Sequence, residues 1–174
     1  KLNDTFTSLL DKINIVIESE KPNLVIVQGD TTTAVAGAIS AFYNKVKIAH
    51  VEAGLRTNDL NEPWPEEANR KIISSIANFH FAPTSHAKEN LIKEGISSSK
   101  IFKTGNTVVD ALHQISKKIK SDKKSVKVLK DKYFFLNSKK KIILITLHRR
   151  EIFGNKLKSI LKAFKAIAKK HKSF

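Results

Sequence analysis

Acidic, hydroxyl and basic residues follow directly after several apolar segments of this chain, and together they could form a site for chemistry. The apolar segments LVIVQ, IAHV and ILITL each run into residues of these types. Ligands of open α/β sheets bind outside the carboxyl ends of the strands, so we expect these side chains to line one cleft. The residues concerned are Asp30, Thr31, Glu52, Arg56, His148 and Arg149.

Three carboxylates are candidates for proton transfer: Asp30, Glu52 and Glu66, the last in the segment NEPWPEEANR. Carboxylates that crowd one cleft raise one another's pKa, so one can stay protonated as an acid while another acts as a base. Each also has a structural interpretation. Asp30 could cap the next helix, Glu52 could pair with Arg56, and Glu66 would be a favourable acid in the first turn of a helix.

The three threonines after Asp30 can cap the following helix, but capping accounts for one hydroxyl only. A carboxylate at that position would repel a phosphate group, so the segment does not fit a plain phosphate site. The GxGxxG and GxxxxGK[ST] patterns are absent, so we predict neither a dinucleotide cofactor nor a P-loop. The HExxH pattern of metal sites and the GxSxG pattern of serine nucleophiles are absent as well, so we predict neither a metal nor Ser/His/Asp catalysis. Of the histidines, only His148 follows a predicted strand beside arginines, whereas His50 and His80 are expected in the core or on a face of the sheet.

The composition limits the classes of function. The chain has 174 residues, no cysteine, no methionine and a net charge of +16. No apolar run approaches the length of a membrane span. The lysines cluster with few aromatics between them, at residues 117–132, 139–141 and 169–172, so we interpret them as solvated helix faces rather than a nucleic-acid site. Because the first residue is lysine, we expect the chain to be part of a longer protein.

Helical and strand patterns alternate along the chain with short connections, which predicts the α/β class with a parallel sheet and right-handed crossovers. The segment LVIVQ is apolar without alternation, so we predict a strand covered on both faces. Predicted helices are residues 9–18, 32–43, 66–78, 85–95, 108–129 and 157–171; predicted strands are residues 24–28, 46–53, 79–83, 100–107 and 140–151.

Five motifs resemble, in this order, those of the non-hydrolysing UDP-N-acetylglucosamine 2-epimerases: QGDTTT, HVEAGLRT, PWPEEANR, TGNTVVDAL and HRRE. The resemblance implies Rossmann-like domains in a GT-B type two-domain architecture that is incomplete in this chain. Residues 1–108 would be the later part of the N-terminal domain, residues 109–138 a hinge helix, and residues 139–174 the start of the C-terminal domain. The family's GTRPE-type segment is missing, so we expect this fragment alone to be inactive.

The resemblance also implies an activity and roles for residues. The family interconverts UDP-N-acetylglucosamine (UDP-GlcNAc) and UDP-N-acetylmannosamine (UDP-ManNAc) by eliminating UDP and adding it back with inversion at C2, without a cofactor or a metal. The implied catalytic residues are Asp30, Glu52, Glu66 and His148, and the implied substrate-binding residues are Arg149, Thr31 and Arg56. His148 would assist departure of the diphosphate.

By the same resemblance we expect a bacterial, cytoplasmic enzyme of cell-surface polysaccharide biosynthesis that is a homodimer when complete. UDP-GlcNAc would be its substrate and, as in bacterial members, an allosteric activator, while neither nucleic acid nor a membrane would be a partner. Two alternatives keep a nucleotide-sugar substrate: a hydrolysing UDP-GlcNAc 2-epimerase and a GT-B glycosyltransferase. A third, from a different class, is a basic nucleic-acid-binding module that would use the lysines.

Overall fold

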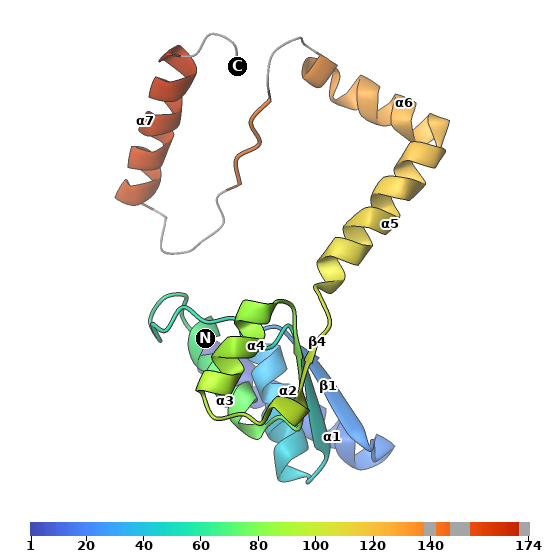
Figure 1. Cartoon of the computed structure of the whole chain (residues 1–174), viewed down its shortest axis with the longest axis vertical. Helices are drawn as coiled ribbons and strands as arrows, with labels where there is room; N and C mark the ends of the chain where they lie inside the picture. Colours follow the sequence, from blue (N-terminus) through green and yellow to red (C-terminus); the bar gives the residue numbers. More distant parts are fainter. Residues whose placement is uncertain (138–141, 147–153, 171–174) are drawn as a thin grey trace. The chain divides into compact units, whose positions relative to one another are not determined.

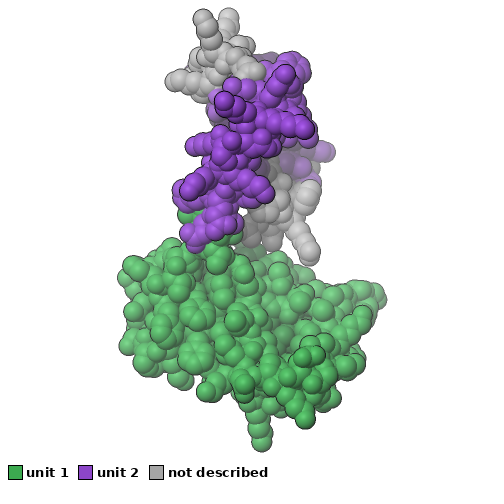
Figure 2. Space-filling model, turned by 90° about the vertical axis from the view of Figure 1, so that its right-hand side faces the viewer, with its two compact units in different colours: residues 1–109 green, residues 110–174 purple. Residues whose placement is uncertain are grey.

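The computed structural model describes residues 1–137, 142–146 and 154–170 (Figure 1). The chain divides into two compact units, Lys1–Val109 and Asp110–Phe174, which Figure 2 distinguishes by colour. The division into domains that the motifs imply stays a prediction. Among the described residues, no helix is both long enough and apolar enough to cross a membrane.

The first unit is built around a parallel sheet with strands in the order β1-β2-β3-β4. The strands are β1 (Leu24–Gln28), β2 (Lys47–Val51), β3 (Phe79–Ala82) and β4 (Ile101–Lys103). The helices are α1 (Leu2–Glu20), α2 (Thr32–Tyr43), α3 (Glu66–Ile76) and α4 (Ser85–Lys93), with a short 3-10 helix, η1 (Ser98–Lys100). This arrangement confirms the predicted α/β class with parallel strands.

One face of the sheet carries the core. Buried residues of neighbouring strands lie in register across this face: Val27 pairs with His50, and His50 pairs with His80. Ala-rich α2 packs between α1 and α3, and Val27, Ile48 and Ile73 join the cluster that they form. A second cluster lies under α4 and includes Leu91. Because the strands are parallel, their carboxyl ends lie along one edge of the sheet.

The prediction that the strand LVIVQ is covered on both faces is wrong for the described structure. Val27 is buried, but Ile26, on the opposite face of β1, is 64% exposed. Each consecutive strand is added on the same side of the previous one, so right-handed crossovers place α2, α3 and α4 on a single face of the sheet. Within the described residues, the other face therefore stays largely open.

The second unit contains α6 (Lys123–Lys132), the 3-10 helix η2 (Phe134–Asn137) and α7 (Asn155–Lys170), and α5 (Thr107–Ser121) leads into it. The single helix predicted over residues 108–129 is in fact two helices. Asp122 has an extended backbone and its carboxylate accepts from the backbone N–H of Lys124 at 3.0 Å, so it caps α6. A side chain that satisfies free N–H groups starts a new helix at this point.

The strand predicted over residues 140–151 is not observed where the structure describes it. Residues 142–146 adopt no regular secondary structure, and Leu144 is 86% exposed. A strand requires a neighbour for its backbone N–H and C=O groups, and the described part of the second unit contains no other strand. The remaining residues of that prediction, 140–141 and 147–151, lie outside the described residues.

Candidate functional site

The chain turns sharply directly after β1 and directly after β2, and the two turns are neighbours at the edge of the sheet. The backbone N–H of Gly29 donates to the carbonyl of Val51 at 3.0 Å, which extends the ladder by one residue. Gly29 and Glu52 both have a left-handed backbone, with φ of 73° and 67°. A Cβ atom placed on Gly29 would lie 3.7 Å from Oε2 of Glu52. The structure therefore places the Glu52 carboxylate against the turn that carries Asp30.

Thr31, rather than Asp30, caps α2. Its backbone is extended, and its hydroxyl oxygen accepts from the backbone N–H of Ala34 at 3.2 Å. The structural interpretation of Asp30 as the helix cap is therefore wrong, and its carboxylate is available for another contact. The substrate-binding role of Thr31 stays a prediction.

Helix α3 holds Asp30 through two neighbouring side chains. The amide of Asn69 donates to the backbone carbonyl of Asp30 at 2.8 Å. Nε and Nη2 of Arg70 lie 2.8 Å and 2.6 Å from the same oxygen of Asp30, Oδ2. The Asp30 side chain is only 26% exposed. Both guanidinium contacts converge on Oδ2, so Arg70 does not use Oδ1 of Asp30.

Glu66 is half-buried at the start of α3, and its neighbour Glu67 is fully buried. Glu67 accepts from the backbone N–H of Asn58 at 3.1 Å and from Nη1 of Arg70 at 3.0 Å. Burial raises the pKa of Glu67, but hydrogen bonds from the backbones of Thr57 and Asn58 and from Arg70 outweigh that effect, so the pKa is lowered overall. The network thus contains an ionised buried carboxylate to which sequence reasoning gave no role.

Arg56 is paired with Glu94, so the predicted pairing of Glu52 with Arg56 is wrong. Nε and Nη2 of Arg56 each lie 2.7 Å from an oxygen of Glu94, and its side chain is 1% exposed. Further hydrogen bonds reach the hydroxyl of Ser74 and the carbonyl of Leu55, both at 2.8 Å. The Arg56 hydrogen bond lowers the pKa of Glu94. These contacts fix the position of the Arg56 side chain, and its substrate-binding role stays a prediction.

His50 supports the Gly29 turn from inside the sheet. Of the two placements predicted for His50 and His80, the core or a face of the sheet, the structure shows burial in the core, since both are at most 1% exposed. Nε2 of His50 lies 2.8 Å from the carbonyl oxygen of Gly29. Burial lowers the pKa of His50 despite this hydrogen bond, so the ring is neutral and Nε2 carries the proton that it donates. The imidazole therefore fixes the carbonyl that precedes Asp30.

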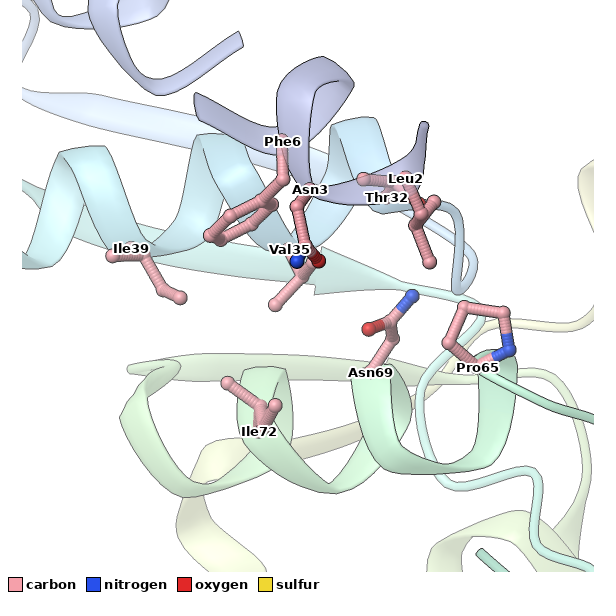
Figure 3. Close-up of a pocket in the computed structure, with 9 residues that line it drawn as sticks. All are labelled: Leu2, Asn3, Phe6, Thr32, Val35, Ile39, Pro65, Asn69 and Ile72. Atoms are coloured by element: carbon pink, nitrogen blue, oxygen red, sulfur yellow. The ribbon is translucent and has the colours of Figure 1, made fainter. Parts of the chain in front are cut away.

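A pocket of about 200 Å³ lies beside this site, between α1, α2 and α3 (Figure 3). Phe6, Val35 and Ile39 give it mostly apolar walls, and Asn69 and Thr32 line it near the Asp30 turn. Of the predicted catalytic residues, the three that the structure describes, Asp30, Glu52 and Glu66, do not line the pocket. It therefore adjoins the candidate site without forming it.

The structure brings some of the predicted residues together and leaves others outside its description. Asp30 and Glu52 lie at adjacent strand ends, and Glu66 lies on α3, the helix that holds Asp30. His148 and Arg149 lie outside the described residues. Sequence reasoning assigned no role to Glu67, Asn69 or Arg70. Glu67 and Arg70 are an acid and a base three residues apart in a predicted helix, and this spacing could have predicted that they form an ion pair.

Comparison with known proteins decides the family. A family profile described as UDP-N-acetylglucosamine 2-epimerase matches residues 1–174. The chain belongs to this family. It is 52% identical over 170 residues to the UDP-N-acetylglucosamine 2-epimerase of Campylobacter jejuni, a match that covers 96% of this chain and 44% of that protein. The resemblance seen in the five motifs is therefore confirmed.

Solved structures of epimerases agree with the fold. The UDP-GlcNAc 2-epimerase of Neisseria meningitidis, solved bound to UDP-GlcNAc, superposes with a TM-score of 0.95 at 43% identity over 100% of this chain and 47% of that one. The enzyme of Methanocaldococcus jannaschii, in complex with UDP-GlcNAc and UDP, gives a TM-score of 0.82 at 41% identity over 97% of this chain and 45% of that one. The chain spans about half the length of these relatives, in agreement with the predicted incomplete GT-B architecture.

Proposed function

We propose that the complete protein containing this chain is a non-hydrolysing UDP-N-acetylglucosamine 2-epimerase that interconverts UDP-GlcNAc and UDP-ManNAc. The observation that carries the proposal is the pair of carboxylates, Asp30 and Glu52, at adjacent strand ends in a chain that matches the epimerase family along its whole length. The epimerases of Neisseria meningitidis and Methanocaldococcus jannaschii bind UDP-GlcNAc, which supports the same substrate here.

The proposed reaction is an elimination followed by an addition. A carboxylate removes the proton from C2, the electron pair of that C–H bond forms the C1=C2 double bond, and the C1–O bond breaks to release UDP. The addition returns UDP to C1 while a proton is delivered to the opposite face of C2. Acid–base groups are therefore required on both faces of the sugar, and three candidate carboxylates meet this requirement.

In this mechanism we assign the proton transfers to Asp30, Glu52 and Glu66. A carboxylate beside C1 also stabilises the oxocarbenium character that develops as the C1–O bond breaks, as in glycoside hydrolysis. Both contacts of Arg70 are to Oδ2 of Asp30 and neither uses Oδ1, which suits an oxygen that must approach substrate. We place His148 and Arg149 at the diphosphate, where cationic donors meet the negative charge of the departing UDP.

Further assignments follow from the family resemblance and are part of the same proposal. The reaction requires no added cofactor or metal, because the eliminated hydrogen leaves and returns as a proton. Thr31 and Arg56 contribute to binding of the substrate. We also propose that a second UDP-GlcNAc acts as an activator, with Arg149 and Glu66 contributing to its site, and that the complete protein is a cytoplasmic homodimer.

Isotope labelling of the complete protein tests the proposal. UDP-GlcNAc is incubated with the enzyme in deuterated water, without an added cofactor, and the products are followed by NMR. We expect UDP-ManNAc that carries deuterium at C2, because solvent exchanges with the acid–base groups. Turnover without this label would contradict the elimination. Accumulation of free N-acetylmannosamine with UDP would identify the hydrolysing reaction instead.

A further inference from the structure

A chain of contacts runs from a fully buried carboxylate to the candidate site. Glu67 is 0% exposed, Arg70 is 12% exposed and Asp30 is 26% exposed, so the contacts lead from the interior to the surface. Oε2 of Glu67 accepts from Nη1 of Arg70 at 3.0 Å, while Nε and Nη2 of Arg70 contact Oδ2 of Asp30. One guanidinium group therefore binds two carboxylates through different nitrogen atoms.

The planarity of the guanidinium group makes this arrangement directional. The donors of arginine are fixed in one plane, so an acceptor that holds Nη1 also fixes the direction in which Nε and Nη2 point. Glu67 is the more deeply buried of the two carboxylates and cannot exchange its partner for water without a large cost in free energy. Glu67 therefore determines the orientation of Arg70, and Arg70 determines the orientation of Asp30.

The same carboxylate holds the loop that follows Glu52. Oε1 of Glu67 accepts from the backbone N–H of Asn58, a residue with a left-handed backbone at φ 65°. A backbone hydrogen bond from Thr57 also reaches Glu67. The loop between β2 and α3 begins directly after Glu52, so both sides of the candidate site depend on one buried anchor.

We propose that Glu67 is a positioning residue for the epimerase reaction, which acts through Arg70 to present Oδ1 of Asp30 to the substrate. This inference rests on the proposed function, because it requires Asp30 to transfer a proton. Glu67 itself touches no reacting atom. A misplacement of about 1 Å in a reacting group can cost about a hundredfold in rate, so the loss of this anchor is measurable in turnover.

The Glu67→Gln variant of the complete protein tests the role with little change in size. The amide oxygen can still accept from Asn58, but the amide NH2 group faces the donor of Arg70 and displaces it. We expect kcat to fall by about tenfold to a hundredfold while KM for UDP-GlcNAc changes by less than about twofold. Ile17→Val, a core substitution on α1, is the control for lost stability, and it should keep the wild-type kcat.

A double-mutant cycle separates positioning from a purely structural role. If Glu67 acts only through Arg70, adding Glu67→Gln to Arg70→Lys should lower kcat no further. Independent, multiplicative losses would show that Glu67 supports the fold and would overturn the inference. If Glu67→Gln does not yield folded protein, the kcat of Arg70→Lys is measured instead. Lysine keeps the positive charge but cannot donate to Glu67 and Asp30 through separate nitrogen atoms of one planar group. A wild-type kcat in Arg70→Lys would also overturn the inference.

The two proposals fail in different ways. If the wild-type protein does not place deuterium at C2, the proposed function fails before any variant is compared. If the wild-type protein does so, and Asp30→Asn is inactive while Glu67→Gln has the wild-type kcat, the positioning role alone is wrong.

Discussion

Gly29 and Glu52 lie against each other at the carboxyl ends of β1 and β2, and both adopt a left-handed backbone, with φ of 73° and 67°. Glycine accepts this conformation freely, but any residue with a Cβ atom loses about 1–2 kcal/mol in it. Such strain is common where a side chain is retained for function. The backbone of Glu52 therefore supports its assignment to the site independently of the motif that contains it.

Replacing Glu52 should separate activity from stability. In the complete protein, Glu52→Gly relieves the backbone strain, so we expect the free energy of unfolding to stay equal or to rise by up to about 1 kcal/mol. The kcat should fall by at least about a hundredfold, because a general acid or base is lost. Chemical unfolding and an epimerase assay measure the two effects.

Lys45→Gly is the matched control for Glu52→Gly. Lys45 is exposed and also has a left-handed backbone, with φ of 57°. This variant should gain stability for the same reason and keep its activity. A Glu52→Gly protein that is clearly less stable than the wild type would show that the glutamate side chain is structural.

Arg56 provides a second test, because the structure and the motif suggest different roles for it. Its guanidinium group makes four hydrogen bonds in a site that is 1% exposed. Lysine cannot reproduce this fork of donors, so Arg56→Lys should lower the free energy of unfolding by about 2 kcal/mol or more. Glu94→Gln should have an effect in the same direction. Unchanged stability with a raised KM for UDP-GlcNAc would instead support direct binding of substrate.

Gly54, the glycine of HVEAG, allows α4 to pack directly against the backbone that follows β2. A Cβ atom on Gly54 would lie 2.2 Å from the backbone carbonyl oxygen of Ala87, which cannot move aside without displacing the helix. Gly95 also has a positive φ but has no atom within 4 Å of such a Cβ. We expect Gly95→Ala to cost about 1–2 kcal/mol of stability and Gly54→Ala to cost considerably more. Thermal unfolding of the two variants tests this difference. Equal losses of stability in Gly54→Ala and Gly95→Ala would contradict it.

Two buried histidines make the stability of the fold depend on pH. Burial, and then the nearby His50, lower the pKa of His80 to about 4, and burial also lowers the pKa of His50. Between pH 6.5, the ordinary value, and about pH 4, the unfolded chain binds protons that the folded chain does not. The free energy of unfolding should therefore fall as the pH falls through this range, by up to about 3 kcal/mol from His80 alone.

Unfolding midpoints at several pH values measure this dependence. His80→Gln removes one titrating group and should flatten the curve, whereas His86→Gln, at an exposed position of α4, should leave it unchanged. A wild-type midpoint that does not move between pH 6.5 and pH 4 would contradict the neutral, buried state of both rings.

The local pattern of the sequence predicted most of the first unit because neighbouring residues determine those elements. Residues 32–43 were predicted as a helix and form α2 with the same bounds, since Thr31 provides the cap and the small residues allow close packing. The break between α5 and α6 was missed because Asp122 can be either a surface acid in one helix or the cap of a second. Local pattern does not distinguish these cases.

The contacts of the site could not be predicted in the same way, because they join residues that are distant in the sequence. Asp30 and Arg70 are separated by 40 residues, and Arg56 and Glu94 by 38. The motifs placed Asp30 and Glu52 at strand ends, where the structure also has them, but assigned their partners locally, as in the pairing of Glu52 with Arg56. The open face of β1 was likewise set by the order of the strands, which a single apolar segment does not reveal.

The most direct test of the central claim, that the strand-end carboxylates transfer protons, is the kcat of Asp30→Asn in the complete protein. Thr31 still caps α2 in this variant, and the amide oxygen can still accept from Arg70, so we expect nearly unchanged thermal stability. Because the titrating group is lost, kcat should fall by at least about a hundredfold, while Asp11→Asn, on the exposed face of α1, should keep the wild-type rate. A folded Asp30→Asn enzyme with near-normal turnover would contradict the account.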